Sequence, residues 1–205
     1  MDKEGVIKYQ LHHTDAVLPE QLSIAELNAW RTVLFKLNLI GQDPLRYQGL
    51  GYGNISQRLN HSSEFIISGT QTGHLATLQK HDYCLITNAQ PEQNQIYSQG
   101  LCKPSSEALT HASVYQHDHN INAVIHVHSP IIWQNTDKLK LAHTAAHIAY
   151  GTPDMANAVA ELLSSNPKIP VFTMLGHEDG VIAFAENLNT AASLLIQQLA
   201  AALVL

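Results

Sequence analysis

The sequence predicts a mixed α/β or α+β fold. Short apolar runs bounded by polar or turn residues indicate buried strands, and they lie at 65–68, 83–87, 121–130, 171–175 and 181–185. Segments with apolar residues at helical spacing alternate with these runs, at 24–37, 104–117, 153–165 and near the C-terminus. Because helices and strands are interspersed and no repeat or linker separates them, we expect one domain over residues 1–205, with 1–18 as an extended lead-in.

Composition and charge exclude several classes of protein. Of the 205 residues, 45% are apolar and 14% are charged, which is ordinary for a globular protein. The net charge of −6 argues against a nucleic-acid partner, since such proteins are usually basic. No apolar run is long enough to span a membrane, and the N-terminus lacks the layout of a signal peptide. Cys84 and Cys102 form neither a CxxC pair nor a disulfide framework, so we expect thiols in a reducing compartment and a cytoplasmic location.

The first helix is predicted by a capping signal followed by an apolar stripe. Ser23, with Glu26 three residues later, fits a capping box. The stripe that follows consists of Ile24, Leu27, Val33, Leu34 and Leu37. Gly41 is the expected end of the helix, and its leucines are core residues without a chemical role.

A glycine-rich turn follows the strand at 65–68. Before that strand, residues 43–57 are predicted to form a loop that ends in Gly-Asn-Ile-Ser. The turn itself, 69–73, combines hydroxyl groups with flexible backbone and can direct N–H groups at an anion. It is not a P-loop, because no Gly-Lys-Ser/Thr is present, and alone it is more often an ordinary turn. After the next strand, residues 88–100 are predicted to be a polar loop.

The segment Pro104-Ser-Ser-Glu107 is predicted to open a helix that runs to about His117. Ser105 or Ser106 is suited to the N-cap position. A helix N-terminus also binds anions through its free N–H groups and its dipole. Glu107 in the first turn needs no function, because acidic side chains are favoured there.

Two histidines on the strand at 121–130 are the strongest chemical signal. His126 and His128 are two residues apart, so their side chains leave the same face of the strand while Val127 points to the other. Pro130 then ends the strand, because it has no N–H to donate. Two convergent imidazoles suit a metal such as Zn²⁺. The alternative is a pair of histidines on a solvent-facing edge.

The last third of the chain contains a second turn of interest. Residues 139–150 are weakly strand-like, and 153–165 predict a helix. Between the strands at 171–175 and 181–185 lies the turn Gly176-His-Glu-Asp-Gly180. The C-terminal helix, capped by Asn187 or Asn189, is rich in alanine and apolar on several sides, so we expect it to be buried in the domain or in an oligomer.

Taken in order, five motifs resemble the class II aldolase/adducin family. They are Gly-Asn-Ile-Ser at 53–56, Ile-Ser-Gly-Thr-Gln-Thr-Gly at 67–73, Lys-Pro-Ser-Ser-Glu at 103–107, His-Val-His-Ser-Pro at 126–130 and Gly-His-Glu-Asp-Gly-Val at 176–181. Their order and spacing span nearly the whole chain. The resemblance implies a three-layer α/β/α fold with a central, largely antiparallel sheet.

The resemblance also implies a divalent metal, usually zinc, held by three histidines. Two would be His126 and His128, and the third would come from the later turn, where we assign His177. This chain departs from the common pattern, in which a histidine directly precedes the glycine. Asp179 stands at that position here, so it is the rival third ligand.

Further roles follow from the resemblance alone. Glu107 matches the glutamate that serves as general acid/base in the enzymes of the family. The groups that would bind a substrate phosphate are Asn54, Thr72, Gly73, Ser105 and Ser106. The turn 69–73 is longer than the common form, which leaves the identity of the anion open.

The resemblance predicts a zinc-dependent lyase of the aldolase type. It would cleave or form a C–C bond in a small sugar phosphate through a metal-stabilised enediolate. The alternatives are a dehydratase or epimerase on the same scaffold, and a non-catalytic adducin-like domain for protein contacts. The family also implies a homotetramer. The net charge and the lack of a membrane-spanning run argue against a nucleic-acid or membrane partner.

Overall fold

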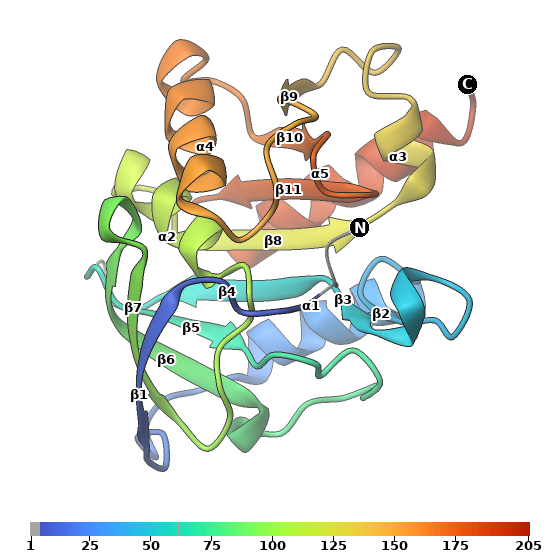
Figure 1. Ribbon diagram of the computed structural model, residues 1–205. Helices are drawn as coiled ribbons and strands as arrows, with labels where there is room; N and C mark the ends of the chain where they lie inside the picture. Colours follow the sequence, from blue (N-terminus) through green and yellow to red (C-terminus); the bar gives the residue numbers. More distant parts are fainter. Residues whose placement is uncertain (1–4, 61) are drawn as a thin grey trace.

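The computed structural model describes residues 5–60 and 62–205, and helices cover both faces of its central sheet (Figure 1). Over the described residues the sheet has nine strands in the order β1-β7-β6-β5-β4-β8-β11-β10-β9. These strands are β1 (Gln10–Asp15), β4 (Asn54–Arg58), β5 (Phe65–Ser68), β6 (Tyr83–Gln90), β7 (Gln95–Gly100), β8 (Ala123–His128), β9 (Ala142–Thr144), β10 (Val171–Met174) and β11 (Gly180–Ala185). A separate short pair consists of β2 (Gly41–Gln42) and β3 (Gly51–Tyr52).

The sheet is mixed, with its parallel pairings at the two edges. In the described part of the chain, β1 pairs with β7 and β9 with β10 in parallel, while the six inner pairings are antiparallel. The prediction of a three-layer fold with a largely antiparallel sheet is therefore confirmed, with parallel strands added at each end. The histidine strand β8 lies at the centre, between β4 and β11.

Two apolar cores separate the sheet from its helices. One core packs α1 (Ala25–Lys36), α3 (Pro130–Gln134) and α5 (Leu188–Ala202) on one face, and includes Val127. The other packs α2 (Ala108–His117) and α4 (Pro153–Ser165) on the opposite face, and includes Val124. Because side chains alternate along β8, His126 and His128 share the face of Val124 and of α2. Burying both faces explains why the inner strands are apolar throughout.

Three short 3₁₀ segments complete the structure: η1 (Tyr47–Gly49), η2 (Lys80–Asp82) and η3 (Pro91–Gln93). The prediction of a polar loop at 88–100 was wrong, because β6 continues to Gln90 and β7 begins at Gln95. Asn94 turns the chain with a positive φ of 57°. The side chains of β7 alternate between buried and half-buried, so a strand can form there with small polar residues such as Ser98 at its buried positions.

Three other local expectations are corrected. Residues 54–57 are not loop but part of the central strand β4, whose Ser56 is held by His111 and Tyr115. The capping box at Ser23 is not formed: Ile24 precedes α1 without a side-chain cap. Glu107 occupies the N-cap position of α2, one residue before the helix. Elsewhere the predicted cap at Asn187 is confirmed, since its side chain accepts from the Thr190 N–H at 2.7 Å. No helix among the described residues is long and apolar enough to cross a membrane.

Candidate functional site

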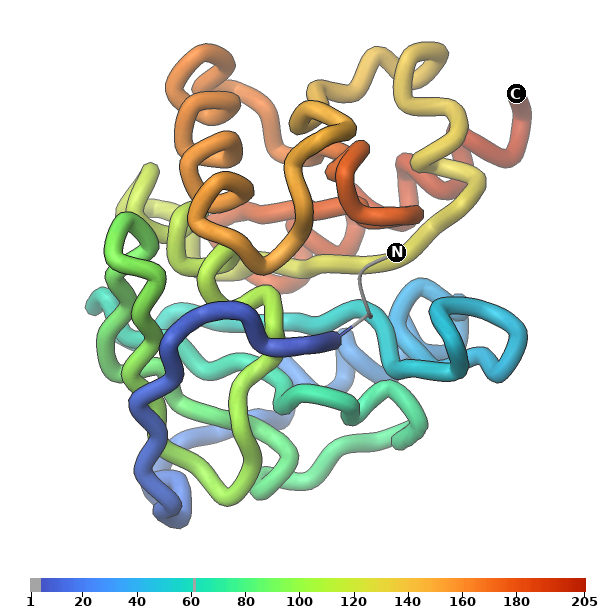
Figure 2. Tube along the Cα trace, viewed as in Figure 1, coloured from blue at the N-terminus to red at the C-terminus, as the bar shows by residue number. Residues whose placement is uncertain are grey.

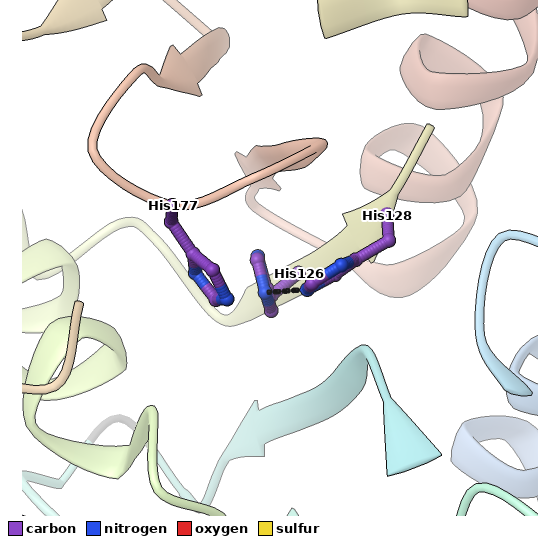
Figure 3. Close-up of side chains that lie close together, drawn as sticks. All are labelled: His126, His128 and His177. Carbon is purple, nitrogen blue, oxygen red and sulfur yellow. Dashed lines mark hydrogen bonds between the residues drawn. The ribbon is translucent and has the colours of Figure 1, made fainter. Parts of the chain in front are cut away.

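Three buried histidines converge at the end of β8. His126 and His128 project from the strand, and His177 reaches them from the turn between β10 and β11 (Figure 3). One ring nitrogen from each lies within 4.8 Å of the others, and the Nε2 atoms of His126 and His128 are 3.1 Å apart. All three are almost fully buried, at no more than 2% exposure. The alternative of a solvent-facing histidine pair is therefore wrong.

The environment keeps the imidazoles of His126 and His128 neutral. Burial, followed by the proximity of His177, holds the pKa of His126 and of His128 well below the ordinary value. A neutral imidazole has a lone pair for a metal, whereas a protonated one has none. Three buried imidazoles with converging nitrogens are the donor set of many catalytic zinc sites, in which each Zn–N distance is ~2.0–2.1 Å. The residues present therefore fit a divalent transition metal.

Asp179, the rival third ligand, accepts hydrogen bonds from Tyr47 and Arg46. Its Oδ2 accepts from the Tyr47 hydroxyl at 2.5 Å and from Arg46 Nη2 at 3.1 Å. Burial and the contact with Asp179 raise the pKa of Tyr47, so its hydroxyl stays protonated and donates. Among the described residues, the group of side chains that could share one ion contains His177 and not Asp179.

A cavity next to the histidines brings together the five residues predicted to bind phosphate. It is lined by Gly5, Gly51, Gly53, Asn54, Gly69, Thr70, Gln71, Thr72, Gly73, Ser105 and Ser106. The turn 69–73 reaches the helix start because Gly69 bridges to Pro104 and the Thr70 N–H donates to the Lys103 carbonyl at 3.0 Å. Asn54 pairs in register with His126, so the cavity adjoins the histidine cluster.

Two contacts hold the walls of this cavity in place. Arg31 of α1 is buried and donates to the carbonyl oxygens of Leu75 and Thr72, the latter at 3.0 Å. Gly73 has no room for a side chain, because a Cβ there would overlap the Gly41 carbonyl oxygen. The backbone of the turn 69–73 is therefore held in place by the buried guanidinium of Arg31 and by close packing against the backbone of Gly41.

Glu107 directly follows Ser105 and Ser106, which line the cavity. It is 1% exposed, and its Oε2 accepts from the Thr110 hydroxyl at 2.9 Å. A Cβ built on Gly151 would lie 3.8 Å from Glu107 Oε1, and the neighbouring Tyr150 ring stacks on His177 at 4.4 Å. The segment 150–151 thus bridges the carboxylate and the histidine cluster.

The N-terminal segment adds a wall that composition did not predict. Lys8 donates to the Tyr150 carbonyl at 3.0 Å, and its ammonium lies 3.9 Å from the centre of the Tyr150 ring. Tyr9 donates to the Ser105 carbonyl at 2.7 Å. Figure 2 shows this dark blue segment running beside the connection that precedes α4. Residues 8 and 9 of the predicted lead-in thus pack against the site, and the residues that follow form the edge strand β1.

A buried network of polar side chains joins α2 to β4 next to the site. His111, one helical turn after Glu107, is fully buried, and its Nδ1 lies 2.7 Å from Ser56 Oγ, which also contacts the Tyr115 hydroxyl at 2.8 Å. Burial lowers the pKa of His111 to about 3, so it is neutral. The spacing of Glu107 and His111, four residues apart on a helix, was a signal available in the sequence. Arg46 and Tyr47, by contrast, lie in a loop without periodicity.

Comparisons with known proteins agree with this geometry. An L-fuculose 1-phosphate aldolase superposes with a TM-score of 0.66 at 17% identity, covering 88% of this chain and 84% of that one. A sugar-phosphate aldolase from Thermotoga maritima gives 0.67 at 15% identity, covering 88% and 92%. YgbL from Escherichia coli, described as a putative aldolase/epimerase/decarboxylase, gives 0.63 at 18%, covering 88% and 86%. At these identities the similarity shows the fold.

The family itself rests on a sequence comparison. No curated protein matches the chain. Residues 45–203 match the family model described as the class II aldolase and adducin N-terminal domain. That range contains the three histidines, Glu107 and all five residues predicted to bind phosphate. Because the match covers most of the sequence, the chain belongs to the class II aldolase and adducin N-terminal domain family.

Proposed function

We propose that this protein is a metal-dependent lyase of the aldolase type that acts on a small sugar phosphate. The observation that carries the proposal is the convergence of His126, His128 and His177 beside a cavity rich in backbone N–H and hydroxyl groups. A cation site next to an anion site suits a substrate that has a carbonyl or hydroxyl at one end and a phosphate at the other. The named solved structures of aldolases support the same class of substrate.

In this proposal the three histidines hold zinc or another divalent ion, which supplies Lewis-acid polarisation of a substrate oxygen when bound. Ser105, Ser106 and Thr72 bind the phosphate through hydroxyl and backbone groups at a helix start. Glu107 takes a proton from the substrate and returns it to the product. Its burial and the hydrogen bond from Thr110 keep the carboxylate oriented for that transfer.

We also propose a homotetramer in the cytoplasm. Leu203, Val204 and Leu205 at the end of α5 are 66%, 84% and 57% exposed, and an interface would cover such an apolar end. Light scattering should report a mass about four times that of the chain, and a stable monomer would contradict the proposal. Cys84 and Cys102 are free thiols, which suits a reducing compartment.

The test of the function is a substrate screen. Purified zinc-loaded protein should cleave or condense at least one short ketose phosphate or aldehyde–ketone phosphate pair, and His126→Ala should abolish that activity. Dehydration or epimerisation of the same compounds would place another reaction on this site. Absence of all three reactions, in protein shown to contain the metal, would favour the non-catalytic adducin-like role.

A further inference from the structure

Two segments far apart in the sequence meet on the outer side of the histidine cluster. One is the loop 43–50, which contains η1, and the other is the turn 176–180. The Tyr47 hydroxyl donates to Asp179 Oδ2 at 2.5 Å, and Arg46 Nη2 donates to the same oxygen at 3.1 Å. Arg46 also donates to the Tyr47 oxygen, so the three side chains form a closed set of contacts. We name this set of Arg46, Tyr47 and Asp179 the latch.

The latch contacts His128 directly and is joined to His177 through the backbone of one turn. The Tyr47 ring lies edge-on to the His128 ring, with centroids 4.7 Å apart. Asp179 is two residues after His177 in the same tight turn, which is closed by the Gly180 N–H donating to the His177 carbonyl at 2.9 Å. The Asp179 carbonyl in turn accepts from the Ser129 N–H at 2.8 Å, next to His128. A shift of Asp179 therefore moves the turn that carries His177.

Three of the eight described non-glycine residues with a positive φ lie where the latch closes. Tyr47, Gln48 and Asp179 have φ values of 48°, 59° and 62°, in the left-handed region that non-glycine residues seldom adopt. Such strain persists only where the surroundings enforce it, and it gathers at functional sites. The Asp179 side chain is 10% exposed and that of Arg46 27%, so the contacts that enforce the strain are largely shielded from water.

We propose that the latch is a positioning device: Arg46 and Tyr47 hold the Asp179 carboxylate, and thereby fix the turn of His177 in ligating geometry against His128. In this role Asp179 is not a ligand, although it stands where the family pattern places one. The inference rests on the proposed metal centre. Partners outside the ligand shell of a metal site typically contribute ~10–100-fold to metal affinity.

The test measures Zn²⁺ affinity by competition with a chromophoric chelator, together with the visible spectrum of the Co²⁺-loaded protein. Tyr47→Phe keeps the ring against His128 and removes the hydroxyl. Asp179→Asn keeps the size and tolerates the left-handed backbone while it removes the charge. Tyr97→Phe is the matched control, because it removes a hydroxyl that bonds Gln95 instead. Unfolding temperatures of the metal-free proteins report any loss of fold.

Each latch variant should bind Zn²⁺ ~10–100-fold more weakly and show a changed Co²⁺ spectrum at saturation, while Tyr97→Phe should match wild type. The double variant should be no weaker than the worse single one, because both remove the same contact. Wild-type affinity in Tyr47→Phe would overturn the latch. Complete loss in Asp179→Asn with full binding in Tyr47→Phe would make Asp179 a ligand and also overturn it. A wild-type protein that binds neither ion would refute the metal centre itself.

Discussion

The ring of Tyr150 stacks on the ring of His177, with centroids 4.4 Å apart and an interplanar angle of 20°. Tyr150 is 4% exposed and belongs to the segment that also reaches Glu107. The stack limits the rotation of the His177 ring. It therefore links the position of the third histidine to that of the carboxylate.

The stack predicts different results for two substitutions at Tyr150. Tyr150→Phe keeps the ring, so the protein should bind metal with an affinity close to that of wild type. Tyr150→Ala removes a buried aromatic ring, which should lower the free energy of unfolding by ~3–5 kcal/mol and weaken metal binding. Denaturant titration and metal competition measure the two effects. Equal metal affinity in the Ala and Phe variants would show that the stack does not position His177.

Glu107→Gln separates an acid/base role from a structural one. The substitution keeps the shape of the side chain and the contact with Thr110, so the fold and the metal content should be unchanged. Turnover should fall ~10²–10⁴-fold, the usual contribution of a positioned acid or base, with a smaller change in KM. Steady-state kinetics on the substrate found in the screen measure both. Full activity would reduce Glu107 to an N-cap residue of α2.

Gly73→Ala tests the anion cavity. The added methyl group would overlap the Gly41 carbonyl oxygen and approach Gly51 Cα to 2.7 Å, so the turn must shift. We expect a cost of ~1–3 kcal/mol in the free energy of unfolding, as for other overpacked sites. Inorganic phosphate should raise the unfolding temperature of wild type and do so much less for the variant. An equal response to phosphate in both proteins would place the anion elsewhere.

The neutral state of His111 predicts a dependence of stability on pH. Its pKa in the folded protein is about 3, against an ordinary value of 6.5. Below pH 6.5 the unfolded chain therefore binds a proton that the folded chain refuses, and stability falls as the pH is lowered towards the folded pKa. One such group contributes up to ~1.4 kcal/mol per pH unit. His111→Gln should remove that contribution.

The measurement for His111 is the difference between the two unfolding curves over the pH range 4–7. Wild type should lose stability more steeply than His111→Gln as the medium becomes acidic, and the two should run parallel above about pH 6.5. Parallel curves throughout would mean that His111 takes up a proton in the folded protein as readily as in the unfolded chain.

The sequence predicted the centre of the fold better than its edges. Strand β8 was identified because apolar residues surround the histidine pair, and the alternation of a strand placed both rings on one face. The strand at 83–87 was predicted, but its continuation to Gln90 and strand β7 were missed because these residues are polar, such as Gln95 and Ser98. Pairing of β7 with β1, and the burial of Ser98, make a strand that hydrophobicity alone does not indicate.

The site was predictable where spacing carries the information, and not where the fold brings distant loops together. His126 and His128 follow from a two-residue spacing, whereas His177 was assigned from the family resemblance, with Asp179 as the rival. The contact that distinguishes them, between Asp179 and Tyr47, joins residues 132 positions apart. Arg31 beneath the turn 69–73 is another case, since nothing on an amphipathic helix marks which cation will be buried.

The most direct test of the account is the metal content of the purified protein. Elemental analysis of wild type, after exposure to zinc and removal of the excess, should give about one ion per chain. His126→Ala should contain almost none while it keeps a cooperative unfolding transition, because the three histidines form a site and not the core. A wild-type protein without bound metal, or a His126→Ala variant with a full complement, would contradict the three-histidine centre.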